Sequence, residues 1–127
     1  MRSLRDVVYP LRMAPYRAAI IERHRRAQSA RRTRMRAEAA RLAGIVGSQF
    51  PIRRLYLYGS VVDARPLAVW SDIDLAVEGL PPGRFLELSG ALTAATEYHV
   101  DLKPMEELAE DQRRHIALQG VLLLERD

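Results

Sequence analysis

The pattern of apolar and polar positions predicts a long helix at the start of the chain. Between Pro15 and Val46 there is no further proline, and Ala and Arg are abundant, which favours a helix. The apolar stripe is clearest in the second half, where Met35, Ala39, Leu42 and Val46 recur at helical spacing. We expect that half to pack on a core. The first half should project or break, because a helix of this length spans roughly 48 Å, more than a small domain is wide.

Beyond this helix, short apolar runs alternate with turn residues. Leu55–Tyr58 is rich in aromatics and stops at Gly59, which is typical of a strand. Further on, the apolar residues Ile73, Leu75 and Val77 alternate along the chain, which indicates a second strand. The full prediction is strands at residues 55–58, 73–77, 98–102 and 121–124, helices at 85–96 and 106–119, and turns at the prolines and glycines between them.

This order of elements predicts an α+β (α/β) domain, in which helices flank a small mixed β-sheet of about four strands. We expect residues 1–34 to form a loose lead-in, over 1–13, and a projecting basic helix. Residues 35–127 should form the folded domain, with Gly47 and Pro51 closing the long helix. A chain of 127 residues favours one small core. A large substrate must therefore lie on an open surface, or a partner must complete the site.

Composition removes several classes of function. The chain has no cysteine, which excludes disulfides, thiol catalysis and cysteine-ligated zinc. Its longest apolar runs, such as Val121–Leu124, are far too short to span a bilayer, so no membrane association is expected. We expect a cytoplasmic protein.

Charge is divided unevenly along the chain. Residues 1–50 hold 12 arginines and three acidic residues, whereas residues 51–127 hold 8 Lys and Arg against 13 Asp and Glu. The predicted domain is therefore acidic, which suits cation binding. No aromatic residues interleave with the arginines at 23–36, so stacking of nucleic-acid bases there is not favoured. A solvated helix is the preferred interpretation, and docking to a partner is the second.

Gly59 and Ser60 form a candidate phosphate site at the end of the first predicted strand. Glycine lets the backbone turn sharply and approach a ligand. Serine adds a hydroxyl, and such a turn offers free N–H groups to an anion. The dipeptide alone is weak evidence, because many strands end in an ordinary Gly-Ser turn.

Asp72 and Asp74 form a candidate metal site. Positions i and i+2 of a strand point to one face, so the two carboxylates stand side by side while Ile73 faces the core. Two such carboxylates repel each other, and a divalent cation relieves this. Hard oxygen ligands that leave room for water and phosphate suit magnesium. An edge strand with a solvated polar face would explain the alternation of polar and apolar residues. It would not explain why both polar positions are aspartates.

Asp101 is a third candidate ligand. It is a lone carboxylate between Val100 and Leu102 in the third predicted strand. An outward-facing residue is the commoner explanation for such a position. If its strand neighbours the one that carries Asp74, three carboxylates meet, and three can hold two metal ions about 4 Å apart.

These motifs together resemble the signature of the DNA polymerase β-type nucleotidyltransferase superfamily. The signature comprises Tyr58-Gly59-Ser60, then Asp72-Ile73-Asp74-Leu75, then Val100-Asp101-Leu102. Residues 35–125 are similar more narrowly to the minimal nucleotidyltransferases of bacteria and archaea, including the stretch Ser71–Pro82 and the pattern from Ile116 to Leu123. The loop departs from the family, because Val61-Val62-Asp63 stands where Arg and Gly are often found.

The resemblance implies roles for these residues. Gly59 and Ser60 would bind the triphosphate of ATP or another nucleoside triphosphate, while Asp72, Asp74 and Asp101 would hold two Mg²⁺ ions. Asp101 would also help to activate the attacking hydroxyl. Two further residues in the loop are open to interpretation: Arg65 could contact phosphate or be a surface charge, and Trp70 could stack on a base or pack in the core.

The resemblance also implies a biological setting. Minimal nucleotidyltransferases are often encoded beside a small helical HEPN-domain protein, as the antitoxin of a toxin–antitoxin pair. Such an antitoxin transfers AMP from ATP to a tyrosine of its partner. We therefore expect an adenylyltransferase that acts on a HEPN-type partner.

Two other functions stay open at this stage. The protein could be a catalytically weak binding module that neutralises a partner by contact, because its phosphate loop is atypical and its first helix is basic. It could instead be an RNA-end nucleotidyltransferase that uses the basic helix. A long helix also makes a homo-oligomer plausible.

Overall fold

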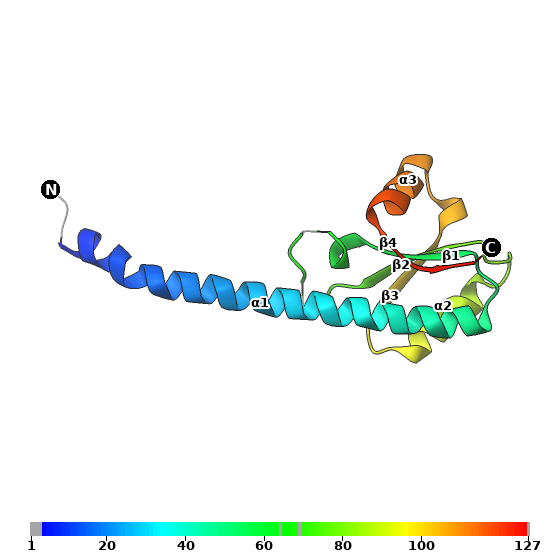
Figure 1. Ribbon diagram of the computed structural model, residues 1–127, viewed down its shortest axis with the longest axis horizontal. Coiled ribbons are helices and arrows are strands. Elements are labelled where there is room, and N and C mark those ends of the chain that lie inside the picture. Colours follow the sequence, from blue (N-terminus) through cyan, green and yellow to red (C-terminus); the bar gives the residue numbers. More distant parts are fainter. Residues whose placement is uncertain (1–3, 64, 69, 127) are drawn as a thin grey trace. The chain divides into compact units, whose positions relative to one another are not determined.

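The elements follow the order expected from the sequence. The computed structural model describes residues 4–63, 65–68 and 70–126, and the side chains from residue 15 onward. In chain order the elements are α1 (Leu4–Gln49), β1 (Arg54–Tyr58), the 3₁₀ turn η1 (Gly59–Val61), β2 (Ile73–Glu78), α2 (Phe85–Ala95), β3 (Val100–Pro104), the 3₁₀ turn η2 (Met105–Glu107), α3 (Glu110–Gln119) and β4 (Val121–Glu125) (Figure 1). This content confirms the predicted α+β fold class.

The four described strands form one mixed sheet in the order β3-β2-β1-β4. The central strand β1 is antiparallel to both β2 and β4, whereas β2 and β3 are parallel. Parallel neighbours need a crossover connection, which α2 supplies here. As a result, β2 and β3 begin at the same end of the sheet, and the candidate site lies at this end.

The two faces of the sheet pack against different helices. Alternate residues such as Leu57, Ile73 and Leu75 are fully buried on one face, in a core that includes Leu42 from α1 and Leu88 from α2. The other face forms a smaller cluster that α3 covers, whose buried members are Tyr56, Ala76, Met105 and Ile116. Figure 1 shows α3 alone above the sheet, with α2 and the later part of α1 below it.

The chain divides into two units, one up to Arg31 and one from Arg32 onward. The described part of the first unit is helical, and its large apolar side chains Tyr16, Ile20 and Ile21 are exposed. The second unit contains the sheet and both cores. Among the described residues, no helix combines the length and the apolar character that crossing a bilayer requires.

The long helix differs from its prediction at both ends. It begins at Leu4 rather than Pro15, so the described part of the lead-in is helical, and residues 1–3 lie outside the described residues. The helix runs through Pro10 and Pro15, although a proline within a helix removes a backbone donor and weakens it. Gly47 does not close the helix, which continues to Gln49. Gly47 is instead a packing position, since a Cβ there would lie 3.2 Å from the Leu124 side chain.

The C-terminal elements also begin later than predicted. The third strand starts at Val100 rather than residue 98, and the last helix starts at Glu110 because residues 105–107 form the turn η2. On α3, Ile116 is the buried residue, whereas His115 and Leu118 are exposed.

Candidate active site

Asp74 lies at the centre of the candidate site. It is in register with Tyr58 on β1 and with Asp101 on β3. Residues that pair across neighbouring strands share a face of the sheet. The parallel pairing of β2 with β3 therefore brings Asp74 and Asp101 together, although they are 27 positions apart in the sequence.

Asp72 joins this pair from the residue just before β2. Ile73, between the two aspartates, is fully buried, and its N–H group donates to the His99 carbonyl at 2.9 Å. This hydrogen bond continues the pairing with the chain before β3. It holds Ile73 in the core and leaves the carboxylates of Asp72 and Asp74 on the opposite side.

The three carboxylates interact electrostatically. Burial first, and then the negative charges of Asp101 and Asp72, raise the pKa of Asp74 to about 6, against the opposing effects of Lys103 and Arg65. Burial, helped by Asp74 and Asp101, likewise raises the pKa of Tyr58 to about 12. The nearby protein charges therefore do not balance the negative charge of this cluster.

The outer two aspartates are turned toward neighbouring nitrogen atoms. Asp72 Oδ1 lies 3.2 Å from His99 Nδ1, and Asp101 Oδ2 lies 3.7 Å from Lys103 Nζ. Among the described residues, no three His, Cys, Asp or Glu side chains form a ready-made ion site.

The donor set nevertheless fits a hard divalent cation. Asp72, Asp74 and Asp101 offer only carboxylate oxygens. Burial and the two neighbouring carboxylates disfavour the charged form of Asp74, and such a cation would offset both effects. Mg²⁺ needs few protein carboxylates, because it keeps water and substrate phosphates in its remaining positions.

Gly59 and Ser60 start a tight turn beside Asp74. Gly59 has φ +80, a left-handed conformation that suits glycine, and a Cβ there would overlap Oδ2 of Asp74. The N–H groups of Val62 and Asp63 donate to the Gly59 carbonyl at 3.0 and 2.9 Å and close the turn. The N–H groups at the start of such a turn have no partner within it and can face a ligand.

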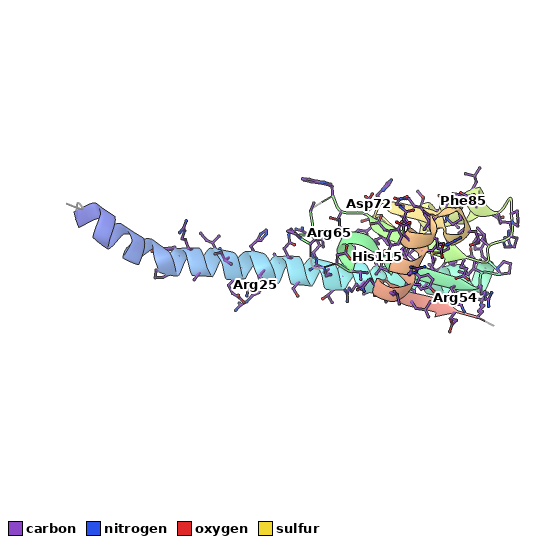
Figure 2. The ribbon with its side chains drawn as sticks, turned by 90° about the horizontal axis from the view of Figure 1, so that it is seen from above. Arg25, Arg54, Arg65, Asp72, Phe85 and His115 are labelled. Carbon is purple, nitrogen blue, oxygen red and sulfur yellow. The ribbon has the colours of Figure 1, made fainter. Side chains whose placement is uncertain are left out.

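The loop between β1 and β2 places Arg65 near the carboxylates. Arg65 forms an ion pair with Asp63 at 2.7 Å, and it also lowers the pKa of Asp74 by its charge. Trp70 is 83% exposed, so the packing role considered for it is wrong. Figure 2 shows Arg65 and Asp72 toward one end of the domain and Arg54, at the start of β1, toward the other.

Two arginines of α1, which sequence analysis did not single out, hold this loop. Arg32 donates to the Arg65 carbonyl at 2.7 Å and to the Ser60 carbonyl at 3.4 Å. Arg36 donates to the carbonyls of Val61 and Val62 at 3.3 and 3.4 Å. These two arginines belong to the run that was interpreted as a solvated helix face. Nothing in the sequence distinguishes them from their neighbours, because the contact depends on the tertiary fold.

The fold and the carboxylate edge of the sheet define a nucleotidyltransferase. The model of the family described as "Polymerase beta, Nucleotidyltransferase" matches residues 41–127, which is most of the chain. The chain therefore belongs to the polymerase beta nucleotidyltransferase family, as the motifs suggested. A comparison with curated proteins finds no match for the sequence.

Solved structures with the same fold include several toxin–antitoxin proteins. The toxin–antitoxin MntA–HepT has 22% identity and a TM-score of 0.54, with 72% of this chain and 73% of that chain covered. A tri-AMPylated Shewanella oneidensis HEPN toxin in complex with MNT antitoxin has 23% identity and a TM-score of 0.54, with the same coverage. A toxin–antitoxin with AMP-PNP has 24% identity and a TM-score of 0.55, again with 72% and 73% covered.

Proposed function

We propose that this protein transfers AMP from ATP to a hydroxyl group of a partner protein, with Asp72, Asp74 and Asp101 as the magnesium ligands. The observation that carries the proposal is the register of Asp74 with Asp101, beside a Gly59–Ser60 turn that is itself in contact with Asp74. This arrangement would bring a cation site and a phosphate site together at one end of the strands. Family membership supports the same reaction.

The chain's own residues would position the triphosphate. The turn at Gly59 and Ser60 would receive the β- and γ-phosphates through its leading N–H groups and the serine hydroxyl. Arg65, whose charge reaches Asp74, would stabilise negative charge on the phosphates from the loop side. The bridging oxygen between the α- and β-phosphorus atoms would then face β1, and pyrophosphate would leave in that direction.

The acceptor hydroxyl would approach from the opposite side, where Asp101 lies on the edge strand β3. Its oxygen forms a bond to the α-phosphorus as the bond to the bridging oxygen breaks. Asp101 would accept the hydroxyl proton through a carboxylate oxygen. Bound Mg²⁺ would supply charge neutralisation at the phosphates and lower the pKa of the attacking hydroxyl.

The partner is proposed by analogy with the structural neighbours. One neighbour is an MNT antitoxin in complex with an AMPylated HEPN toxin, and another is a toxin–antitoxin with AMP-PNP. By this analogy the present chain is an antitoxin of the minimal type, acts in the cytoplasm, and modifies a helical HEPN-type protein. A small domain with an open carboxylate edge fits an acceptor that arrives on another protein.

The proposal is tested by incubating the protein with ATP labelled on the α-phosphate, Mg²⁺ and the helical protein encoded beside it. Transfer of label is expected with the wild type and is expected to fall by at least about a hundredfold with Asp74→Asn. Glu87→Gln is the matched control. Glu87 is an exposed acidic residue of α2 that pairs with Arg84, and α2 covers the face of the sheet opposite to the carboxylates. No transfer by the wild type, or equal transfer by Asp74→Asn, would refute the proposal.

A second candidate function is neutralisation of the partner by contact alone. The ion pair of Asp63 with Arg65 supports it, because an acidic side chain then occupies the one arginine that the loop offers to phosphate. This loop is also where the sequence departs from its family. If toxicity of the partner is still suppressed by the double variant Asp72→Asn and Asp74→Asn, contact is sufficient and the second function is favoured.

A further inference from the structure

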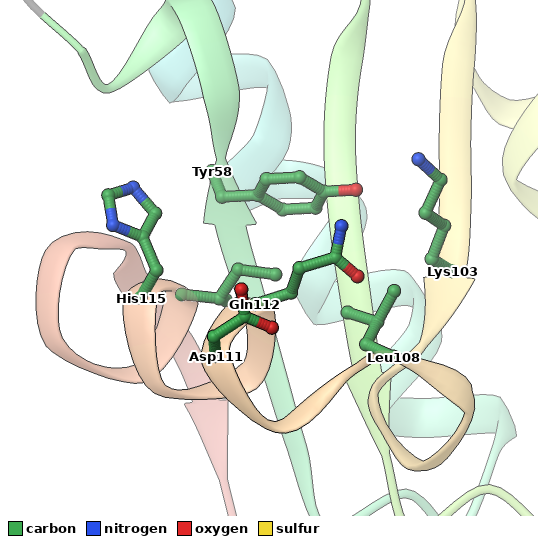
Figure 3. Close-up of a pocket in the computed structure, with 7 residues that line it drawn as sticks. Tyr58, Lys103, Leu108, Asp111, Gln112 and His115 are labelled. Atoms are coloured by element: carbon green, nitrogen blue, oxygen red, sulfur yellow. The ribbon is translucent and has the colours of Figure 1, made fainter.

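A pocket of about 480 Å³ lies between the sheet and α3, next to the carboxylate cluster. It is lined by Tyr58, Lys103, Leu108, Asp111, Gln112, His115 and Ile116 (Figure 3). Its floor is the sheet and its opposite wall is α3. A volume in this range is typical of small-molecule sites.

The pocket is adjacent to the carboxylates along the strand direction. Tyr58 is in register with Asp74, and Lys103 follows Asp101 by two positions on the same face of β3. In Figure 3 the Tyr58 ring extends from β1 across β2, so that its hydroxyl faces the strand that carries Lys103. Two residues further along these strands, Tyr56 and Ala76 pack under Ile116. The pocket therefore begins where the carboxylate cluster ends.

The geometry of the reaction restricts what can enter the pocket. In an in-line displacement, the attacking and leaving oxygens lie on opposite sides of the α-phosphorus. In the proposed function the leaving group faces the Gly59 turn on β1 and the acceptor approaches over β3, so both lie along the line that crosses the strands. The nucleoside is the remaining large substituent of the α-phosphorus. It must therefore extend parallel to the strands, either out to solvent or into the pocket under α3.

The side chains of the pocket suit a nucleoside. Leu108 and Ile116 are aliphatic walls, and the Tyr58 ring is a flat aromatic surface of the kind on which bases pack. Gln112 Oε1 accepts a hydrogen bond from the Ala109 N–H at 3.3 Å, which orients the amide. Asp111 and Lys103 add an acceptor and a donor at the rim.

We propose that this pocket binds the base and ribose of the nucleoside triphosphate. The inference rests on the proposed nucleotidyl transfer, and it adds the place where the nucleoside is held. It assigns to the segment from Leu108 to Ile116 a role that the signature motifs do not include. It also leaves the edge strand β3 open for the acceptor protein.

The test compares the binding of two magnesium complexes by calorimetry. MgATP carries the nucleoside, whereas magnesium tripolyphosphate carries the phosphates alone. The wild type is expected to bind MgATP at least about tenfold more tightly than tripolyphosphate, because only MgATP fills the pocket. Leu108→Trp, which fills the pocket, is expected to lose this preference and to keep its affinity for tripolyphosphate.

Two further variants make the test decisive. Leu118→Trp is the matched control, because Leu118 is 73% exposed on α3 outside the pocket, and it should behave as the wild type does. Gln112→Met keeps the length of an exposed side chain and removes its polar groups. It should weaken MgATP binding severalfold even if Leu108→Trp does not fold.

Each result has one interpretation. Loss of MgATP affinity with unchanged tripolyphosphate affinity in the pocket variants supports the inference. Unchanged MgATP affinity in those variants overturns it, including the case in which only transfer to the partner is lost, because the acceptor then occupies the pocket. An equal loss of affinity for MgATP and for tripolyphosphate also overturns it, because the substitution has then disturbed the carboxylate site and not a nucleoside pocket. A wild type that binds neither ligand contradicts the proposed function itself.

Discussion

Gly59 lies directly against the carboxylate of Asp74, so closely that a Cβ atom at position 59 would overlap Oδ2. The proposed phosphate turn and the proposed metal ligands are therefore in contact, although Gly59 follows β1 and Asp74 lies on β2. Gly59 directly follows β1, and Asp74 on β2 is the partner of Tyr58, the last residue of β1. This contact makes glycine necessary for two reasons: the close approach, and the positive φ of +80.

Replacing Gly59 by alanine should therefore impair both stability and activity. The left-handed backbone costs an L-residue about 1–2 kcal/mol, and the new methyl group must also displace the Asp74 carboxylate. We expect the free energy of unfolding to fall by at least this amount and the transferase activity to be lost. Chemical denaturation and the labelled-ATP assay measure the two effects.

The matched control for this variant is Gly90→Ala. Gly90 lies within α2, and a Cβ there meets no atom within 4 Å. Alanine in a helix interior is more favourable than glycine by roughly 0.5–1 kcal/mol, so this variant should be slightly more stable and fully active. Equal behaviour of the two variants would show that the contact of Gly59 with Asp74 is unimportant.

The charge of Asp74 should destabilise the protein when no divalent cation is bound. Its pKa is raised to about 6 from an ordinary value of 3.8, so between these values the folded state binds more protons than the unfolded state. Stability should therefore decrease as the pH rises through this window. Asp74→Asn, which stays neutral, should have a higher Tm than the wild type above about pH 7 in the presence of a chelator. The two Tm values should converge below about pH 4, and a lower Tm for the variant at neutral pH would contradict this account.

Magnesium should reverse this effect. A cation that binds only the folded state raises Tm with concentration, and it competes with the proton for Asp74. We expect MgCl₂ to raise the Tm of the wild type near pH 8, to raise it much less near pH 5, and to have little effect on Asp74→Asn. The fluorescence of Trp70, which is exposed two residues before Asp72, gives an independent signal of cation binding. An Mg²⁺ response that is the same at both pH values would argue against Asp74 as a ligand.

The fold could be predicted because its signals are local. The apolar stripe of Met35, Ala39 and Leu42 and the alternation around Asp74 each lie within one element, and all three stripe residues are buried as expected. The ends of elements were less predictable. Gly47 has the chemistry of a helix end, but packing against Leu124 gives it another role within the helix. A glycine carries no local sign of which role the tertiary fold will require.

The site was predictable only in part, for the same reason. Asp72 and Asp74 are two positions apart, so the strand period alone places them together. Asp101 joins them only because α2 crosses over and makes β3 the parallel neighbour of β2. The pocket residues Leu108 and Gln112 belong to segments that meet the sheet only after folding, and no motif in the sequence marks them.

The contact of Arg32 with the loop after β1 leads to the last prediction. Arg32 donates to two loop carbonyls, those of Ser60 and Arg65, and hydrogen bonds from a charged donor contribute roughly 1.5–3 kcal/mol when they are well protected. Because this contact is partly exposed, we expect Arg32→Met to weaken MgATP binding by about tenfold at most while the core, and hence most of the stability, is retained. Arg34→Met, on the exposed side of the same helix, is the matched control and should bind as the wild type does. Calorimetric titration with MgATP measures the difference. If both arginine variants bind MgATP equally well, the loop keeps its shape without α1, and the helix contributes only to the core.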